Sequence, residues 1–356
     1  AGGVQSTPKL TASQIMVRWS PTSTANQRLA ALGAIGGRVV GTIHADLMQQ
    51  LGQGVVEVIG LPPGMSPDQA IRAYGNRPGV ELVEVDWVVG TQAISNDPYY
   101  TTSSRLWGMY SSDNPTAAGG SGTTNAFGSQ AEQAWAQGQT GSSKVVVGVI
   151  DEGIDYTHPD LYLNIFLNQG EIRGLSFFSS LTDINGDGLI TFRDLNHSSN
   201  AAFVGDINLN DRIDAGDLLN DSRWADGIDT DGNGYKDDLI GWDFVYNTNN
   251  PYRPLEGDNH GTHVAGTIGG IGSNGVGVAG VNWDVQLMAL KFLGPNGGYT
   301  SGAVAAVNYY ANMTSQHGTT AQYVGTNNSW GGGRFSSTLN NAIGNGGRAG
   351  NLFVGA

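Results

Sequence analysis

An apolar run that ends in an acidic residue constrains the fold of this chain more than any other feature. Residues 144–150 have the sequence KVVVGVI, and Asp151 follows directly. Strands of a parallel sheet are buried on both faces and are therefore continuously apolar, and functional residues lie at their carboxyl ends. Three further strands are predicted at 285–292, 323–328 and 351–356. Helices are predicted over 258–270 and 301–313. The pattern indicates an α/β fold with a parallel sheet flanked by helices.

Charge and composition exclude several classes of protein. The 356 residues include 31 Asp and Glu against 17 Lys and Arg, a net charge of −14. This excess argues against nucleic acid or an anionic membrane as partner, and no apolar run reaches the roughly 18 residues of a membrane helix. The lack of cysteine excludes a disulfide scaffold, a zinc ribbon and a cysteine nucleophile. Residues 181–260 contain 16 acidic and 5 basic residues, which suggests either a cation site or an acidic solvated loop.

The N-terminal part of the chain is predicted to form a small α+β unit. Its predicted strands are 14–20, 37–43, 55–61 and 80–89, and its predicted helices are 23–34 and 66–73. Ser66 is the expected N-cap of the second helix, and Pro67 lies in its first turn. This order of elements is ferredoxin-like, and by itself it says nothing about function.

Two motifs carry recognisable chemistry. Asp151 ends a predicted buried strand, and His260 opens a small-residue helix with the sequence HGTHVAGTIGG. A serine hydroxyl is a poor nucleophile until a neighbouring base takes its proton, and an acid commonly orients that base. The simpler alternatives are an acid that caps a turn and a histidine that merely begins a helix.

The stretches VVVGVIDEGIDYTHPDL, NHGTHVAGT, GVGVAGV and NNSWGGG resemble the subtilisin family of serine peptidases over about residues 97–356. The resemblance implies that Asp151 orients the imidazole and that His260 is the general base. It also implies polypeptide substrates, held as an extended strand by two edge segments. These segments consist of Gly297, Gly298 and Tyr299, and of Ser329, Trp330 and Gly331. Glu152 departs from the family pattern, in which a small hydroxyl residue usually follows the aspartate. For Trp330, the alternative to substrate contact is packing in the core.

The resemblance also implies a domain organisation. Residues 1–95 are similar to the family's propeptide, which acts as an intramolecular inhibitor and folding template. Residues 96–356 are the expected N-terminal part of the peptidase domain, with a sheet incomplete at its C-terminus. The expected product-like segment is 85–93, with cleavage within 88–96. Secretion to the extracellular space follows from the family and from calcium use.

The nucleophile is not expected among these residues. The family order places the serine roughly 150 residues after the histidine, and only 96 residues follow His260. Ser301 lies between the two substrate segments and is predicted to be a helix N-cap. We therefore expect the chain to end before both the serine and the oxyanion-hole asparagine, and to be inactive alone.

The acidic segment 181–257 is predicted to be an insertion. The aspartate and histidine of the family order lie roughly 30 residues apart, whereas His260 follows Asp151 by 109 residues. Within the insertion, three loops alternate oxygen-bearing residues as EF-hand loops do, and they are predicted to bind Ca²⁺. The predicted ligands are Asp183, Asn185, Asp187, Leu189 and Asp194 in the first loop; Asp206, Asn208, Asn210, Asp214 and Asp217 in the second; and Asp229, Asp231, Asn233, Tyr235 and Asp238 in the third.

A further calcium site is implied only by the family resemblance. Its implied ligands are Asp160, Asn274, Val276 and Val278, with Asp97 as a possible contributor. The alternative is a plain glycine-rich turn in GSNGVGVAGV.

Two alternative functions remain open at this stage. The paired loops resemble dockerin repeats, so the chain could be a binding module for a cohesin-like partner. It could also be a pseudoprotease that keeps the triad remnants without the nucleophile.

Overall fold

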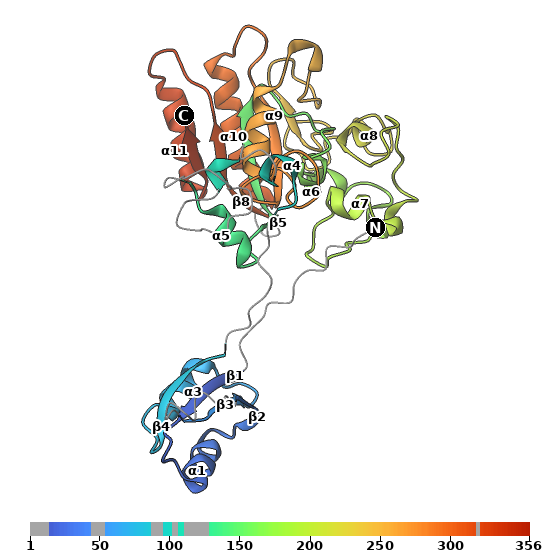
Figure 1. Cartoon of the computed structure of the whole chain (residues 1–356). Coiled ribbons are helices and arrows are strands. Elements are labelled where there is room, and N and C mark those ends of the chain that lie inside the picture. Colours follow the sequence, from blue (N-terminus) through green and yellow to red (C-terminus); the bar gives the residue numbers. More distant parts are fainter. Residues whose placement is uncertain (1–13, 44–53, 87–94, 102–105, 110–127, 318–320) are drawn as a thin grey trace. The chain divides into compact units, whose positions relative to one another are not determined.

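The computed structural model describes residues 14–43, 54–86, 95–101, 106–109, 128–317 and 321–356. The chain divides into two compact units, Ala1–Thr91 and Gln92–Ala356. Figure 1 labels most of the helices and strands of each unit.

The smaller unit is a four-stranded antiparallel sheet with two helices. Its elements are β1 (Gln14–Trp19), α1 (Ala25–Ile35), β2 (Arg38–Ile43), β3 (Val56–Gly60), α3 (Pro67–Tyr74) and β4 (Val80–Val85). The strand order is β2-β3-β1-β4, and every neighbouring pair is antiparallel. The predicted α+β order is confirmed. The expected strand end and cleavage segment beyond residue 86 fall largely outside the described residues.

Local sequence explains both helices of the smaller unit. Thr24 and Ser66 are N-caps, and each forms a capping box with the glutamine three residues later. Pro67 occupies the first turn of α3, where a missing N–H costs nothing. Alternate residues of β1, namely Ile15, Val17 and Trp19, are fully buried beneath the helices.

The larger unit contains a five-stranded parallel sheet in the order β6-β7-β5-β8-β9. The strands are β5 (Gly141–Asp151), β6 (Gly241–Asp243), β7 (Asp284–Lys291), β8 (Gln322–Asn328) and β9 (Leu352–Gly355). β5 is central, so its carboxyl end lies between those of β7 and β8. The predicted α/β fold with a parallel sheet is confirmed.

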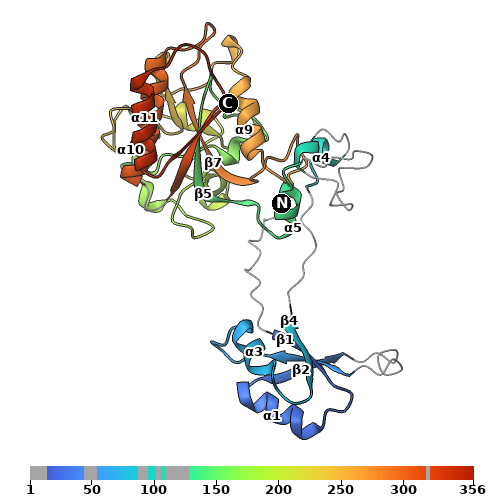
Figure 2. The same cartoon turned by 90° about the vertical axis from the view of Figure 1, so that its left-hand side faces the viewer.

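Helices cover both faces of this sheet. The helices are α4 (Pro98–Thr101), α5 (Ala131–Ala136), α6 (Gln169–Ile172), α7 (Phe192–Leu195), α8 (Ala215–Leu219), α9 (His260–Gly269), α10 (Thr300–His317) and α11 (Ser337–Arg348). Figure 2 shows α9 on one side of the sheet and α10 and α11 on the other. Short 3₁₀ turns lie at Trp107–Met109, Tyr162–Asn164, Phe178–Ser180, Ser198–Asn200 and Pro254–Glu256.

Two details of the α10–α11 face differ from the sequence prediction. Ser301 is the second residue of α10, so it lies inside the helix and is not its N-cap. α11 was not predicted, because its sequence contains three glycines, which have low helix propensity. Packing stabilises α11: its Ala342 and Gly346 are buried, and Ser336 caps its first turn.

The acidic segment is part of the core of the larger unit. Phe192, Leu195, Ala215 and Leu218 are buried in the same apolar cluster as Val149 of the central strand. Several acidic side chains of the segment are themselves buried, among them Asp194, Asp217 and Asp238. The acidic residues are therefore held on a framework that shares the peptidase core.

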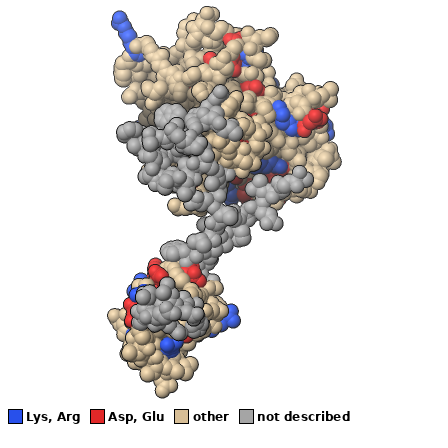
Figure 3. All heavy atoms as spheres, viewed as in Figure 1, with Lys and Arg blue, Asp and Glu red and all other residues tan. Residues whose placement is uncertain are grey.

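Charged side chains on the surface lie among uncharged ones. On the face drawn in Figure 3, basic and acidic groups of the larger unit occur side by side within a mostly uncharged surface. Among the described residues, none of the helices has both the length and the apolar character needed to cross a membrane.

Candidate functional site

The site is built around Asp151, the last residue of β5. Its side chain is fully buried, and the N–H of Glu152 donates to Oδ1 at 2.8 Å. Its backbone carbonyl accepts from the N–H groups of Phe292 and Leu293, which follow β7. The carboxylate is therefore held at the carboxyl edge of the sheet, as the apolar run predicted.

His260 begins α9 and faces Asp151. Its Nδ1 lies 2.9 Å from Asp151 Oδ1 and 3.0 Å from Oδ2. The next residue must be glycine, because a Cβ on Gly261 would lie 2.2 Å from the carbonyl oxygen of Gly153. The imidazole is 51% exposed, and its Nε2 has no hydrogen-bond partner in the described part of the chain. One ring nitrogen is thus anchored by a buried carboxylate while the ring remains accessible.

The surroundings strengthen His260 as a base. The hydrogen bond that His260 Nδ1 donates to Asp151 raises the pKa of His260 above its ordinary value of 6.5, and partial burial opposes this shift. The negative charges of Asp151 and Glu152 add to the increase. Because the carboxylate holds Nδ1, a proton can be taken up at Nε2.

Glu152 has a role that the sequence did not reveal. Its Oε1 accepts from the N–H of Asn259 at 2.9 Å and from the N–H of His260 at 2.5 Å. Free N–H groups at a helix start bind anions well. Glu152 therefore caps the helix that carries the imidazole.

Lys291 is a second residue that the sequence analysis missed. It ends β7 opposite Asp151, and its side chain is fully buried. Its Nζ donates to both oxygens of Asp258, at 2.8 and 2.9 Å, and to the carbonyls of Glu152 and Leu293. This ion pair ties the residues before α9 to the sheet. A lysine directly after the apolar run LMAL of this strand was the available signal.

The two predicted substrate segments follow the strands that flank β5. Gly297–Tyr299 lies between β7 and α10, where Gly294 and Gly297 exchange backbone hydrogen bonds, and Tyr299 is 86% exposed. Ser329 follows β8 and accepts from the side chain of Asn327. Trp330 packs edge-on against Phe292, with ring centroids 4.8 Å apart, and contacts Phe353. The core packing that was the alternative for Trp330 is therefore present, and Gly331 beside it is exposed.

A cavity of about 690 Å³ lies beside α9, but it does not contain the Asp151–His260 pair. Leu161, Thr262, His263 and Val278 are among its lining residues. The cavity and the exposed imidazole are therefore separate features of α9.

Three loops of the acidic segment repeat one conformation. They begin at Asp183, Asp206 and Asp229, at a constant spacing of 23 residues. In each loop the first aspartate accepts from the N–H groups of the fifth and sixth residues at 2.7–3.3 Å. The fourth and sixth residues of each loop have positive φ. At the sixth position of the second loop this conformation is adopted by Asp211, where the other two loops have glycine.

The twelfth residue closes the first two loops. Asp194 Oδ1 accepts from the N–H of Ile184 at 2.9 Å, and Asp217 Oδ1 accepts from the N–H of Ile207 at 2.7 Å. The acceptor is thus the twelfth residue and the donor is the second. The predicted ligand Asn210 has a buried Oδ1 without a hydrogen-bond partner. This oxygen of the second loop is therefore free to face an ion.

The third loop lies beside Glu171, which the sequence analysis did not identify. Oxygen atoms of Glu171, Asp229 and Asp231 lie within 4.8 Å of one another. Calcium binds oxygen at about 2.3–2.6 Å, so a single ion could contact all three. Burial, together with the charges of Asp238, Asp231 and Asp229, raises the pKa of Glu171 to about 8. This cluster is a possible metal site.

Other predicted ligands of the third loop have protein partners. The buried Asp238 accepts hydrogen bonds from Asn233, Asn168 and the hydroxyl of Tyr309. The ring of Tyr235 packs against Trp242, and its N–H donates to Asn233 Oδ1.

The family-implied calcium residues also lie together. Asp160 accepts from the Asn274 amide at 2.9 Å and from the Val278 N–H at 2.8 Å. The buried Asp97 accepts from three successive N–H groups of the same turn, those of residues 273–275. Val276, in contrast, is partly exposed and donates its N–H to Asn274. Burial raises the pKa of Asp160.

Comparisons with known families agree with this architecture. The profile of the subtilase family matches residues 142–356, and that of the fervidolysin N-terminal prodomain matches residues 4–86.

Individual relatives match this chain over only part of their own length. An extracellular basic protease of Dichelobacter nodosus is 31% identical over 252 residues, which are 70% of this chain and 31% of that protein. Subtilisin-like protease 1 of Plasmodium berghei is 32% identical over 145 residues, 41% of this chain and 15% of that protein. An extracellular protease of Xanthomonas campestris is 30% identical over 278 residues, 77% of this chain and 36% of that protein. The chain thus spans about a third or less of the length of these relatives.

Among solved structures, a protease from Pseudoalteromonas arctica is 26% identical, with a TM-score of 0.39, and the match covers 74% of this chain and 58% of that one. The family profile covers more than half of the chain, including Asp151 and His260. The chain therefore belongs to the subtilase family of serine peptidases and carries an N-terminal prodomain of the fervidolysin type.

Proposed function

We propose that this chain provides the acid and base of a calcium-stabilised extracellular endopeptidase that cleaves polypeptides by acyl transfer. The observation that carries the proposal is the 2.9 Å contact between buried Asp151 and Nδ1 of the exposed His260. In this proposal Asp151 fixes the ring and stabilises the imidazolium, and His260 Nε2 takes the proton of a serine hydroxyl.

The reaction would proceed in two halves. The serine oxygen attacks the peptide carbonyl while its proton moves to Nε2, and His260 then gives that proton to the leaving amine. Water then attacks the acyl-enzyme while its proton moves to Nε2. His260 returns that proton to the serine oxygen as the carboxylic acid leaves. We propose that the serine comes from outside residues 1–356, because the family order places it roughly 150 residues after the histidine.

We further propose that Gly297–Tyr299 and Ser329–Gly331 hold the substrate backbone. Both segments follow strands next to β5, so they share the edge of the sheet at which Asp151 ends. The exposed glycines allow a peptide strand to approach closely. Residues 1–95 would serve as the intramolecular inhibitor, and 96–356 would form the first part of the peptidase domain. The names of the extracellular relatives support secretion.

Calcium binding is the remaining part of the proposal. The insertion 181–257 would bind Ca²⁺ through its three loops, and a further ion would bind at Asp160 and Asn274. Carboxylate, amide and carbonyl oxygens are the donors that Ca²⁺ prefers. A bound ion would also offset the repulsion among the 16 acidic residues of 181–260. EDTA should lower the melting temperature and added Ca²⁺ should restore it; an unchanged melting temperature would contradict calcium binding.

The catalytic proposal is tested by comparing the 356-residue chain with an extended chain that continues into the serine-containing segment. We expect the extended chain to hydrolyse casein and to react with a fluorophosphonate probe, and the 356-residue chain to do neither. His260→Ala should abolish both activities in the extended chain. His263→Ala, one turn along the same helix, is the matched control and should leave most activity intact. An extended chain that is inert, or that keeps its activity after His260→Ala, would contradict the proposal.

A further inference from the structure

The third acidic loop differs from the other two at its twelfth position. Counting from Asp229, that position is Ile240, which is fully buried in the apolar core. The corresponding residues of the first two loops are Asp194 and Asp217. An EF-hand-like loop normally takes its closing carboxylate from this position. The third loop therefore lacks a closing acid of its own.

Glu171 occupies the place of that missing acid. In the first two loops, the N–H of the second residue donates to the twelfth carboxylate. In the third loop, the N–H of the second residue, Thr230, donates to Glu171 Oε2 at 3.2 Å. The same hydrogen bond is therefore kept, although its acceptor comes from α6, more than fifty residues earlier in the chain.

The packing of α6 brings Glu171 close to the loop. A Cβ on Gly174, just after α6, would lie 2.4 Å from Thr230 Cγ2, so any larger residue there would force Thr230 to shift. Asn168, the N-cap of α6, donates to Asp231 Oδ2 at 3.1 Å. Contacts on both sides of α6 thus hold the Glu171 carboxylate against the third loop.

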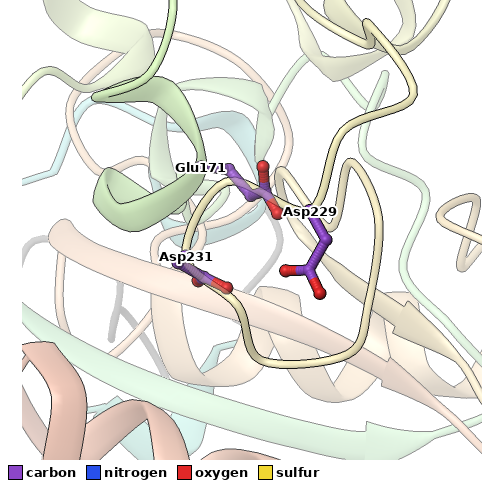
Figure 4. Close-up of side chains that lie close together, drawn as sticks. All are labelled: Glu171, Asp229 and Asp231. Atoms are coloured by element: carbon purple, nitrogen blue, oxygen red, sulfur yellow. The ribbon is translucent and has the colours of Figure 1, made fainter.

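One oxygen of Glu171 remains free for a ligand. The residue is only 4% exposed, and its Oε1 is buried without a hydrogen-bond partner. A buried carboxylate oxygen without a partner is costly, and a bound ion is one of the few explanations for it. In Figure 4 the side chains of Glu171, Asp229 and Asp231 point toward a common space inside the loop.

We propose that Glu171 closes the third loop as the carboxylate ligand of a Ca²⁺ ion, together with Asp229 and Asp231. This inference rests on the proposed calcium binding of the acidic segment. Asp238, predicted from the sequence to serve this loop, then supports the site indirectly, because its oxygens accept from Asn168, Asn233 and Tyr309. The site would link α6 to the loop and so bind two distant parts of the chain together.

The test is calorimetric titration of the full 356-residue chain with Ca²⁺, with Glu171→Gln as the main variant. Glutamine keeps an acceptor for the Thr230 N–H but removes the charge. We expect one binding site to be lost or to weaken by at least about ten-fold. Adding Asp229→Asn should cause no further loss, because both residues serve the same ion. Asp194→Asn is the matched control: it should weaken a different site, and its effect should add to that of Glu171→Gln.

Thermal unfolding shows whether Glu171 binds Ca²⁺ or only supports the fold. In EDTA, Glu171→Gln should melt at the same or a higher temperature than the unsubstituted chain, because glutamine keeps an acceptor for the Thr230 N–H and adds no charge beside Asp229 and Asp231. In Ca²⁺ it should gain less stability than the unsubstituted chain. Glu171→Asp, which keeps the charge but shortens the reach, should give an intermediate calcium effect and serves if Glu171→Gln does not fold.

The outcomes distinguish the role of Glu171 from the proposed calcium binding of the acidic segment as a whole. If the unsubstituted chain binds no Ca²⁺, calcium binding by the segment is wrong, and the role of Glu171 is wrong with it. If Asp229→Asn loses a site while Glu171→Gln binds as the unsubstituted chain does, only the role of Glu171 is overturned.

Discussion

The carboxylate of Glu152 lies 2.5 Å from the backbone nitrogen of His260 and caps the helix that this histidine begins. Glu152 directly follows Asp151, whose carboxylate contacts the imidazole of the same histidine. Two successive acids at the end of one strand thus hold the backbone and the side chain of His260. The position of the base is therefore set by the central strand.

Glu152→Gln should lower the pKa of His260, because it removes a nearby negative charge while keeping a side-chain acceptor. The decrease should be smaller than that caused by Asp151→Asn, since the hydrogen bond to Asp151 is the main cause of the raised value. NMR titration of the imidazole resonances, assigned with His260→Ala, measures both changes. Glu152→Ala should also cost about 1 kcal/mol of stability through the lost cap. An unchanged His260 pKa in Glu152→Gln would contradict this electrostatic role.

The raised pKa of His260 predicts a pH-dependent contribution to stability. Because the folded value exceeds the unfolded value of about 6.5, the contribution is complete below that pH and is lost as the pH rises through the folded pKa. The difference in melting temperature between the unsubstituted chain and Asp151→Asn should therefore be larger at about pH 5.5 than at about pH 9. On a His260→Ala background the pH dependence of this difference should disappear. An equal difference at both pH values would argue against the coupling.

Lys291→Met should destabilise the larger unit by about 3–5 kcal/mol, because it leaves Asp258 buried without its cation. The substitution also removes a donor from the Glu152 and Leu293 carbonyls. Urea unfolding of the 356-residue chain measures the loss. The double variant Lys291→Met, Asp258→Leu should recover part of it, since the unpaired charge is then absent. A single variant as stable as the unsubstituted chain would show that the ion pair is not needed.

Gly261→Ala should separate α9 from the end of β5. The added methyl group would lie 2.2 Å from the carbonyl oxygen of Gly153, and backbone on both sides limits relaxation. We expect a loss of about 1–3 kcal/mol, as for overpacked cores, together with a fall in the His260 pKa as its distance from Asp151 grows. Gly266→Ala is the control within the same helix, because only a Val278 methyl at 3.9 Å lies near its added carbon. Equal effects of the two substitutions would contradict the close-approach argument.

Much of the fold could be predicted because its signals are local. The apolar run before Asp151 predicted the central strand, and Ser66 and Pro67 predicted the start of a helix that the structure confirms. The resemblance to the subtilisin family implied that Asp151 and His260 act as a pair, and the structure brings their side chains within 2.9 Å. α11 was missed because its glycines and asparagines disfavour a helix, and burial of Ala342 against the rest of the core decides its structure.

The rest of the site depends on contacts between distant residues. Glu152 is adjacent to Asp151, yet its function depends on N–H groups more than a hundred residues away. The spacing of the EF-hand-like loops predicted ligands only within each loop. Glu171 lies outside every such window, so only the packing of α6 reveals it. The residue spacing within a loop cannot predict a ligand that a distant segment such as α6 supplies.

The most direct test of the central claim is the rate of peptide hydrolysis by the extended chain carrying Asp151→Asn, His260→Ala or both. If the two residues form one catalytic unit, Asp151→Asn should lower kcat by about 10⁴-fold, and His260→Ala should lower it at least as much. The double variant should then be little slower than His260→Ala alone. Losses that multiply in the double variant, or a fully active Asp151→Asn chain, would contradict the claim that Asp151 acts through His260.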